Sequence, residues 1–305
     1  YSGGESFTIA DPNEIWIMEM IGKGPGVRGA VWVAVRVPDD CISAHANQSR
    51  IHQFDMNDKN NCMYSPDVIS FAREKGYFDG VNKDFSFANA YAPLDFSARR
   101  YCEARVWSYF NMFTARGNEF LPYILGDTDT PMPLFVKPDR KISVQDVKNA
   151  MRDHYEGTPL DISKDFGAGP YHTPYRLSPL SFKVGDKEYF NERPISTQQS
   201  GFVFVAQMRS TLPDAIGGVL WFGTDDANMT VFTPVYCCTD KVPVCYSRVD
   251  GADYITFSWN SSFWIFNWVS NMVYPRYDLM IGDVRATQNE LETTFNEAQE
   301  GIESA

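Results

Sequence analysis

Cys41 and His45 are the pair of side chains whose types and spacing most directly suggest catalysis. They stand four residues apart, and an imidazole beside a thiol lowers the barrier to forming a thiolate nucleophile. The alternative is that Cys41 ends an apolar strand and is simply packed there, as free cysteines often are. The pair alone therefore leaves a cysteine-dependent reaction and a structural role both open.

Other common catalytic motifs do not occur in the sequence. There is no G-x-G-x-x-G between a strand and a helix, since the match at 24–29 leads into another strand-like run. There is also no phosphate-binding G-x-x-x-x-G-K-[ST], no H-E-x-x-H and no G-x-S-x-G. The four histidines (His45, His52, His154 and His172) lack the i, i+4 helical spacing with a carboxylate that metal sites commonly use. The sequence therefore gives no support to a nucleotide-binding protein, a zinc protease or an α/β-hydrolase.

The six cysteines show no C-x-x-C pair, and only Cys237, Cys238 and Cys245 lie close together in the sequence. A disulfide framework and buried free thiols are both compatible with this spacing, and the spacing favours buried thiols.

Composition narrows the class of partner. The chain of 305 residues carries 27 basic and 39 acidic side chains, a net charge of -12, and has no basic run that would follow a line of phosphates. Its most apolar stretch, 263–273, is interrupted by polar residues and is too short to span a bilayer. We expect a soluble protein, cytoplasmic or exported, that binds neither nucleic acid nor membrane.

Strands are predicted at the start of the chain, where they would position a site. Three runs, 6–10, 14–21 and 30–37, are rich in branched and aromatic residues, and the glycine-rich segment 22–26 predicts a hairpin between the last two. The chain opens at Tyr1 and reaches the first strand almost at once, which predicts that the natural protein starts upstream.

Two helices are predicted in the middle of the chain. Ser97 is a candidate cap for a helix to about Arg116, and Ser143 opens a second helix with a capping box that Gly157 would end. The segment 157–193 is rich in Pro and Gly and predicts an ordered loop.

Strands return at 201–208, 218–222, 229–234 and 252–257, and a helix follows from Ser261 to near Ala298. The aromatic group 259–268 has helical spacing, which favours core packing over stacking on sugar rings. The order of strands and helices predicts a layered α+β architecture.

The segment from Asp39 to Ile51, with Ala46-Asn47 and Arg50-Ile51 at its end, closely resembles a stretch of the dipeptidase A family of cysteine N-terminal-nucleophile peptidases. The resemblance continues in the same order through four further segments, so that it covers nearly the whole chain. These segments are Glu5 to Trp16, Trp32 to Arg36, Arg152 to Thr158 and Ser258 to Trp264.

The resemblance implies a four-layer αββα fold with two packed antiparallel sheets, incomplete at its N-terminus. We expect one domain over 1–305, with a helical and loop-rich insertion at about 60–195. It also implies hydrolysis of dipeptides by an N-terminal Cys whose α-amine, with a pKa near 8, acts as base. This mechanism requires no metal and no organic cofactor. Position 1 is Tyr, so the nucleophile is expected outside this chain and the chain alone is expected to be inactive.

Site residues also follow from the resemblance. Asn47 corresponds to the asparagine that holds the oxyanion in related hydrolases, although a strand-end Asn bonding the backbone would look the same. Asp11 on a strand and Arg276 after a helix are further candidates, which a turn Asp and a surface Arg explain equally well. His45, Arg50 and His154 are candidates for contact with the substrate termini.

Three interpretations of function remain open. The first is a dipeptidase acting on small peptides, with homo-oligomers possible. The second is another amide hydrolase or acyltransferase of the same class, because shared chemistry does not fix the substrate. The third is a non-catalytic, aromatic-rich binding protein of the same fold.

Overall fold

The computed structural model describes residues 4–176, 181–247 and 251–304. Its contacts group into two compact units, one made of residues 1–142 and 189–193 and the other of residues 143–188 and 194–305. Neither unit coincides with the predicted insertion at about 60–195, and the single-domain description stays a prediction.

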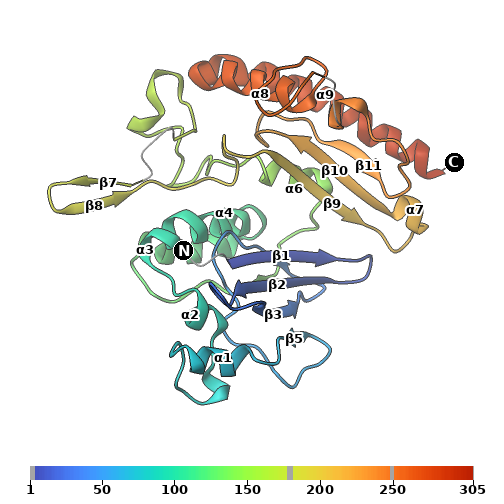
Figure 1. Ribbon diagram of the computed structural model, residues 1–305. Helices are drawn as coiled ribbons and strands as arrows, with labels where there is room; N and C mark the ends of the chain where they lie inside the picture. The colour runs from blue at the N-terminus through green and yellow to red at the C-terminus, as the bar shows by residue number, and fades with distance from the viewer. Residues whose placement is uncertain (1–3, 177–180, 248–250, 305) are drawn as a thin grey trace. The chain divides into compact units, whose positions relative to one another are not determined.

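Unit 1 is built on a four-stranded antiparallel sheet (Figure 1). Its strands β1 (Gly4–Ala10), β2 (Ile15–Gly22), β3 (Ala30–Arg36) and β5 (Cys62–Tyr64) lie in the order β1-β2-β3-β5. The three predicted N-terminal strands and the β2–β3 hairpin are confirmed, with Trp16 opposite Arg36 and Gly22 opposite Ala30. Two short strands, β4 (Ile42–Ser43) and β6 (Phe135–Val136), pair separately.

The core of unit 1 lies on one face of this sheet. Ile17 and Ile21 are buried, whereas the residues that alternate with them along β2 are half-buried. The two isoleucines belong to the same core as Phe71, Phe87 and Tyr91 from the helical segments. The helical segments are α1 (Val68–Glu74), η1 (Asn82–Asp84), α2 (Phe87–Tyr91), α3 (Phe96–Ala98), η2 (Arg99–Glu103), α4 (Ala104–Phe113), η3 (Ala115–Phe120) and α5 (Leu121–Leu125).

The predicted helix from Ser97 forms, but its start and its interior differ from the prediction. Asp95, not Ser97, is the cap: its Oδ1 accepts from the Ala98 N–H at 2.7 Å. The Ser97 hydroxyl instead donates to the same carboxylate. A carboxylate two residues upstream competes for the free N–H groups of the first turn. The helix passes through a π-helical turn at η2 and α4 ends at Phe113.

Unit 2 contains a three-stranded antiparallel sheet in the order β11-β10-β9. Its strands are β9 (Phe202–Met208), β10 (Gly218–Thr224) and β11 (Thr233–Tyr236). On one face of the sheet, Val205 and Trp221 pack with Phe232 and with residues of the helices. Phe202 and Phe204 of β9 are exposed. The helical segments are α6 (Val144–Ala150), η4 (Phe166–Tyr171), α7 (Asp214–Gly217), η5 (Val244–Tyr246), α8 (Ser262–Val273), η6 (Tyr274–Arg276) and α9 (Tyr277–Ser304).

Several predictions for this half are confirmed and others are wrong. The capping box of Ser143 and Asp146 is present, but the helix ends at Ala150, and Gly157 has a positive φ in a later turn. The ordered loop predicted for 157–193 also contains a hairpin, β7 (Ser181–Val184) with β8 (Lys187–Phe190).

The last two predicted strands also differ. Strand β11 begins at Thr233, four residues after the predicted start at Met229. No strand forms over the described residues of 252–257, because the Asp253 carboxylate accepts from the N–H groups of Ile255 and Thr256 and closes a turn. Core packing of the aromatic group is wrong for Trp259 and Trp268, which are 60% and 48% exposed.

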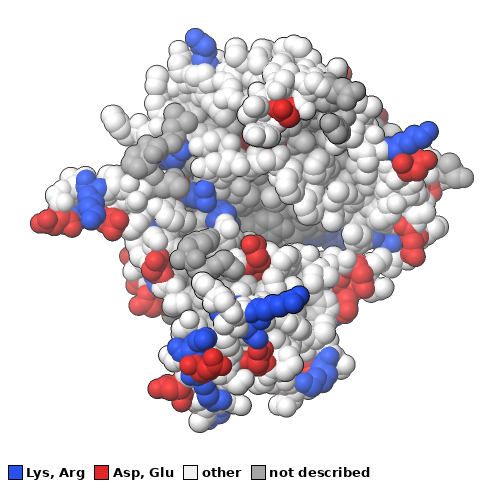
Figure 2. Space-filling model, in the orientation of Figure 1, with Lys and Arg blue, Asp and Glu red and all other residues white. Residues whose placement is uncertain are grey.

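Three further findings bear on the class of protein. All six cysteines lie in the described residues and are free thiols, so the disulfide alternative is not realised. In residues 4–176, 181–247 and 251–304, no helix combines the length and apolar character needed to cross a bilayer. On the face shown in Figure 2, basic and acidic groups are interspersed and do not separate by sign.

Candidate active site

A cavity of about 390 Å³ lies in unit 1. The start of β1, the inward side of β2, the segment 47–49 and the chain from Tyr91 to Cys102 surround it. Its lining residues are Gly4, Glu5, Ser6, Glu19, Ile21, Asn47, Gln48, Ser49, Tyr91, Ala92, Pro93, Asp95, Ser97, Ala98, Tyr101 and Cys102. The cavity thus brings together parts of two segments that resemble the peptidase family, Glu5 to Trp16 and Asp39 to Ile51.

Asn47 lines this cavity in a backbone conformation that few residues adopt. Its φ is +53°, in the left-handed region, where Asn is several-fold enriched over other non-glycine residues. The Nη2 atom of Arg105, on α4, donates to Asn47 Oδ1 at 2.9 Å. Because the amide oxygen faces a cation, the amide N–H groups are left to donate to a ligand. A side-chain amide oriented in this way can act as a hydrogen-bond donor.

Glu19 holds the backbone that follows Asn47. Its carboxylate is 1% exposed and accepts from the Arg50 N–H at 2.6 Å, from the Ile51 N–H at 3.2 Å and from the Ser49 hydroxyl. Burial raises the pKa of Glu19, and the hydrogen bonds from Ser49 and the two backbone N–H groups oppose that rise. A single carboxylate on β2 therefore fixes three consecutive residues of the site segment.

Arg50 lies behind the segment and does not line the cavity. Its guanidinium forms a buried ion pair with Glu103 at 3.0 Å and donates to the carbonyl oxygens of Ala44 and Pro133. These contacts give Arg50 a framework role, and its predicted contact with a substrate terminus stays a prediction.

His45 is two residues before Asn47, and its Nε2 lies 3.0 Å from Thr8 Oγ1 on β1. Burial, followed by the nearby charge of Arg50, lowers the pKa of His45, which favours the neutral imidazole. Cys41 contacts Asp40 rather than His45, with Sγ 3.5 Å from Oδ1. Burial and that carboxylate raise the pKa of the Cys41 thiol, so the two residues do not form an activated thiolate–imidazole pair.

Asp11 lies outside any strand, because β1 ends at Ala10. Its Oδ1 accepts from the N–H groups of Asn13 and Glu14 and thereby closes the β1–β2 turn. These bonds lower the pKa of Asp11. The strand placement was wrong, and the turn is at the opposite end of the hairpin from Gly4 and Glu5 of the cavity.

The other two candidates belong to unit 2. His154 is fully buried there, with Nδ1 3.0 Å from Glu156 Oε1 and its ring edge-on to Tyr175 at 4.9 Å. Arg276 ends η6 and is exposed. Their predicted roles are not tested by this geometry.

Sequence reasoning missed two residues that shape the site, Glu19 and Arg105. Glu19 left a signal in the sequence, since it occupies the inward-facing position between Ile17 and Ile21, where a strand of this kind normally carries an apolar residue. No local sequence pattern indicates Arg105, because its partner Asn47 lies 58 positions away.

Comparison with known proteins defines the class. The model of peptidase family C69 matches residues 1–290, and the chain therefore belongs to that family of peptidases. This confirms the resemblance to the dipeptidase A family, and the mixed α and β architecture with several antiparallel sheets agrees with it.

Three curated relatives illustrate the range of similarity. A probable dipeptidase of Salmonella dublin is 34% identical over 235 residues, 76% of this chain and 47% of the relative. Probable dipeptidase B of Lactococcus lactis is 26% identical over 311 residues, 96% of this chain and 58% of the relative. Dipeptidase A of Lactobacillus helveticus is 25% identical over 259 residues, which are 84% of this chain and 47% of the relative. The chain spans about half the length of the curated relatives it matches.

Proposed function

We propose that the protein containing this chain hydrolyses dipeptides, with the 390 Å³ cavity of unit 1 as the place where the scissile carbonyl is held. The observation that carries the proposal is the Arg105–Asn47 pair at 2.9 Å, which orients a side-chain amide as a donor. The names of the relatives, which are dipeptidases or probable dipeptidases, agree with it.

The reaction begins with attack of a thiolate on the peptide carbonyl carbon. The carbonyl electrons move to oxygen, and the Asn47 amide donates to the oxyanion so formed. Collapse of this intermediate expels the leaving amine, which takes a proton, and forms a thioester. Water then attacks the thioester and regenerates the thiol.

The thiol is proposed to be that of an N-terminal Cys outside residues 1–305, with its own α-amine as base. Cys102 is the one thiol that lines the cavity, and it is buried. Burial raises its pKa, which the Arg105 charge opposes. A thiol held in its neutral form is a poor nucleophile, so Cys102 does not fill that role. We accordingly expect residues 1–305 alone to be inactive.

The charges of the cavity fit one end of a dipeptide. Among the described residues that line the cavity, the charged side chains are Glu5, Glu19 and Asp95, and all three are acidic. Carboxylates attract a positively charged group, and each dipeptide carries an α-ammonium group. We therefore propose that the substrate's amino end enters on this side.

We also propose the four-layer αββα arrangement. Each unit has one sheet face covered by helices and one face with exposed apolar side chains, which is the composition that a packed sandwich needs. Phe7 and Ile9 are exposed on β1, and Phe202 and Phe204 on β9.

Asn47→Ala in the natural full-length protein tests the function. We expect kcat for a dipeptide to fall about 100- to 1000-fold with little change in KM. Asn82→Ala is a matched control, because Asn82 also accepts from an arginine, Arg73, at 2.7 Å but does not line the cavity. Unchanged turnover in Asn47→Ala would remove the oxyanion assignment.

Further measurements separate the alternatives. N-terminal sequencing and intact mass of the natural protein are expected to show a mature chain that begins with Cys upstream of Tyr1. Hydrolysis of N-acyl amino acids but not dipeptides would indicate a related amide hydrolase. Tight binding of dipeptides without turnover would indicate a binding protein.

A further inference from the structure

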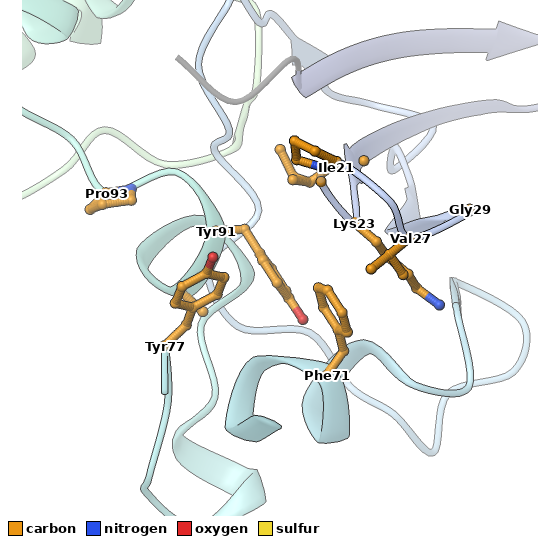
Figure 3. A pocket seen from close by; sticks show the side chains of 12 residues that line it. Ile21, Lys23, Val27, Gly29, Phe71, Tyr77, Tyr91 and Pro93 are labelled. Carbon is orange, nitrogen blue, oxygen red and sulfur yellow. The ribbon is translucent and has the colours of Figure 1, made fainter. Parts of the chain in front are cut away.

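A second and larger pocket, of about 730 Å³, opens beside the candidate active site in unit 1. The end of β2, the loop that joins β2 to β3, and the helical segments from α1 to α2 form its walls. Figure 3 shows Tyr91 and Phe71 in the wall, with Tyr77 on one side and Lys23 and Val27 on the other.

Aromatic rings make up much of the wall. The ring of Tyr91 packs edge-on against Tyr77 at 6.1 Å and stacks near Phe71 at 6.5 Å. The Tyr91 hydroxyl donates to the Val68 carbonyl oxygen at 2.5 Å, so its polar end is already satisfied inside the protein. What Tyr91 offers to a ligand is therefore its ring.

The pocket presents no unpaired charge. Lys23 is the one charged residue among its lining residues, all of which are described, and its Nζ lies 2.5 Å from Asp67 Oδ2. A charged ligand group would have to be desolvated there without a free partner, which is costly. The lining thus favours a neutral, apolar group over a charged one.

The loop that carries Val27 is closed on itself. The Val27 N–H donates to the Gly24 carbonyl at 3.2 Å, and the Lys23 N–H donates to the Gly29 carbonyl at 3.1 Å. Gly24 has a φ of +96°, which residues with a side chain rarely adopt, and this allows the tight turn. Val27 is held at the pocket although 42% of it is exposed.

The pocket shares wall residues with the candidate active site. Ile21, Tyr91 and Pro93 line both the 730 Å³ pocket and the 390 Å³ cavity that contains Asn47. A molecule whose carbonyl lies at Asn47 therefore has apolar space beside it on the same side of unit 1.

We propose that the 730 Å³ pocket is the subsite for a side chain of the dipeptide and that it selects large, neutral, apolar side chains, aromatic ones included. This inference rests on the proposed dipeptidase function and names the substrates that the same site prefers.

Val27→Ala and Tyr77→Ala in the natural full-length protein test the proposal. The substrates are two series of dipeptides, X-Ala and Ala-X, in which X is Gly, Leu, Phe or Glu. In the series whose variable side chain enters the pocket, we expect each variant to lower the Phe-to-Gly ratio of kcat/KM about three- to ten-fold. Each buried methylene group contributes about fourfold, and both Val27 and Tyr77 are partly exposed, so that only part of each side chain is lost as a buried contact.

Val81→Ala is the matched control, because Val81 is an exposed valine of the same unit, 57% exposed, that does not line the pocket. Its Phe-to-Gly ratio should equal that of the unchanged protein. If Val27→Ala and Tyr77→Ala also leave the ratio unchanged in both series while dipeptides are still hydrolysed, the subsite is refuted and the dipeptidase function stands. If the unchanged protein hydrolyses no dipeptide in either series, both the function and the subsite are refuted.

Discussion

The Arg105–Asn47 contact makes a quantitative prediction about how the site is organised. Arg105 donates through Nη2 to Asn47 Oδ1 at 2.9 Å and through Nε to the Tyr101 carbonyl at 2.7 Å, so its guanidinium is fixed at two points. Arg105→Met removes the donor that holds the Asn47 amide oxygen in place and so fixes the orientation of the amide. The side chain is then free to turn its oxygen toward the substrate, where it would repel an oxyanion.

The magnitude follows from the kind of bond that is lost. A hydrogen bond to a charged group contributes about 1.5–3 kcal/mol, which corresponds to about 10- to 150-fold in an equilibrium or a rate. We expect Arg105→Met to lower kcat within this range. Its effect should not exceed that of Asn47→Ala, about 100- to 1000-fold, because Arg105 is argued to act through Asn47.

A double-mutant cycle on the natural full-length protein measures this dependence. In the Asn47→Ala background, Arg105→Met should lower kcat less than about threefold, so the two changes are strongly non-additive. Arg73→Met is the control, because Arg73 also donates through Nη2 to an asparagine oxygen, at 2.7 Å, away from the cavity. Full additivity of the two changes, with each variant shown to be folded by its thermal unfolding, would refute the positioning role.

Three further predictions concern stability. Lys148 is fully buried, and its Nζ lies 3.4 Å from the centroid of the Trp221 ring. Burial lowers the pKa of Lys148 from 10.5 to about 8, and the charge of Glu292 opposes this shift. Because the unfolded chain then binds more protons between pH 8 and 10.5, the free energy of unfolding should rise through that window, by at most about 3 kcal/mol. Lys148→Met should abolish that rise in urea denaturation at pH 7 and pH 10, and an equal pH dependence in both proteins would contradict the assignment. Glu19→Gln replaces an acceptor of three hydrogen bonds by a group that also donates, and it should lower the free energy of unfolding by about 2–4 kcal/mol. A change below about 0.5 kcal/mol in urea denaturation would show that Glu19 does not hold the segment. Phe204→Ala tests the proposed sandwich. If a second sheet covers this 50% exposed ring in the natural protein, the substitution should lower the free energy of unfolding by about 3 kcal/mol. Ile302→Ala, at an exposed position, should lower it by less than about 0.5 kcal/mol. Equal, small effects of Phe204→Ala and Ile302→Ala would leave that sheet face open to solvent.

Local signals accounted for the elements that were predicted correctly. The runs that form β2 and β3 are rich in branched residues and are separated by glycines, and the Ser143–Asp146 capping box lies within four residues of sequence. The resemblance to a known family supplied the class of protein, which is confirmed, and singled out Asn47, whose role stays a proposal. These features need no knowledge of distant contacts.

Failures arose where a nearby or a distant side chain decided the outcome. Asp95 displaced Ser97 as the cap and Asp253 turned the segment predicted as the last strand, both through carboxylate bonds to backbone N–H groups. The roles of Glu19 and Arg105 depend on partners 30 to 58 positions away, which periodicity does not report. The assembly of the cavity could therefore not be read from spacing.

The left-handed backbone of Asn47 has a consequence for judging which members of the family are active. Asn tolerates this conformation far better than most residues, so an asparagine there is retained for the shape of the chain even if catalysis is lost. Its presence in another sequence is thus weak evidence of an enzyme. Arg105 has no such conformational reason to persist, and a member that keeps the asparagine but has lost the arginine should be examined first as a degenerate, inactive copy.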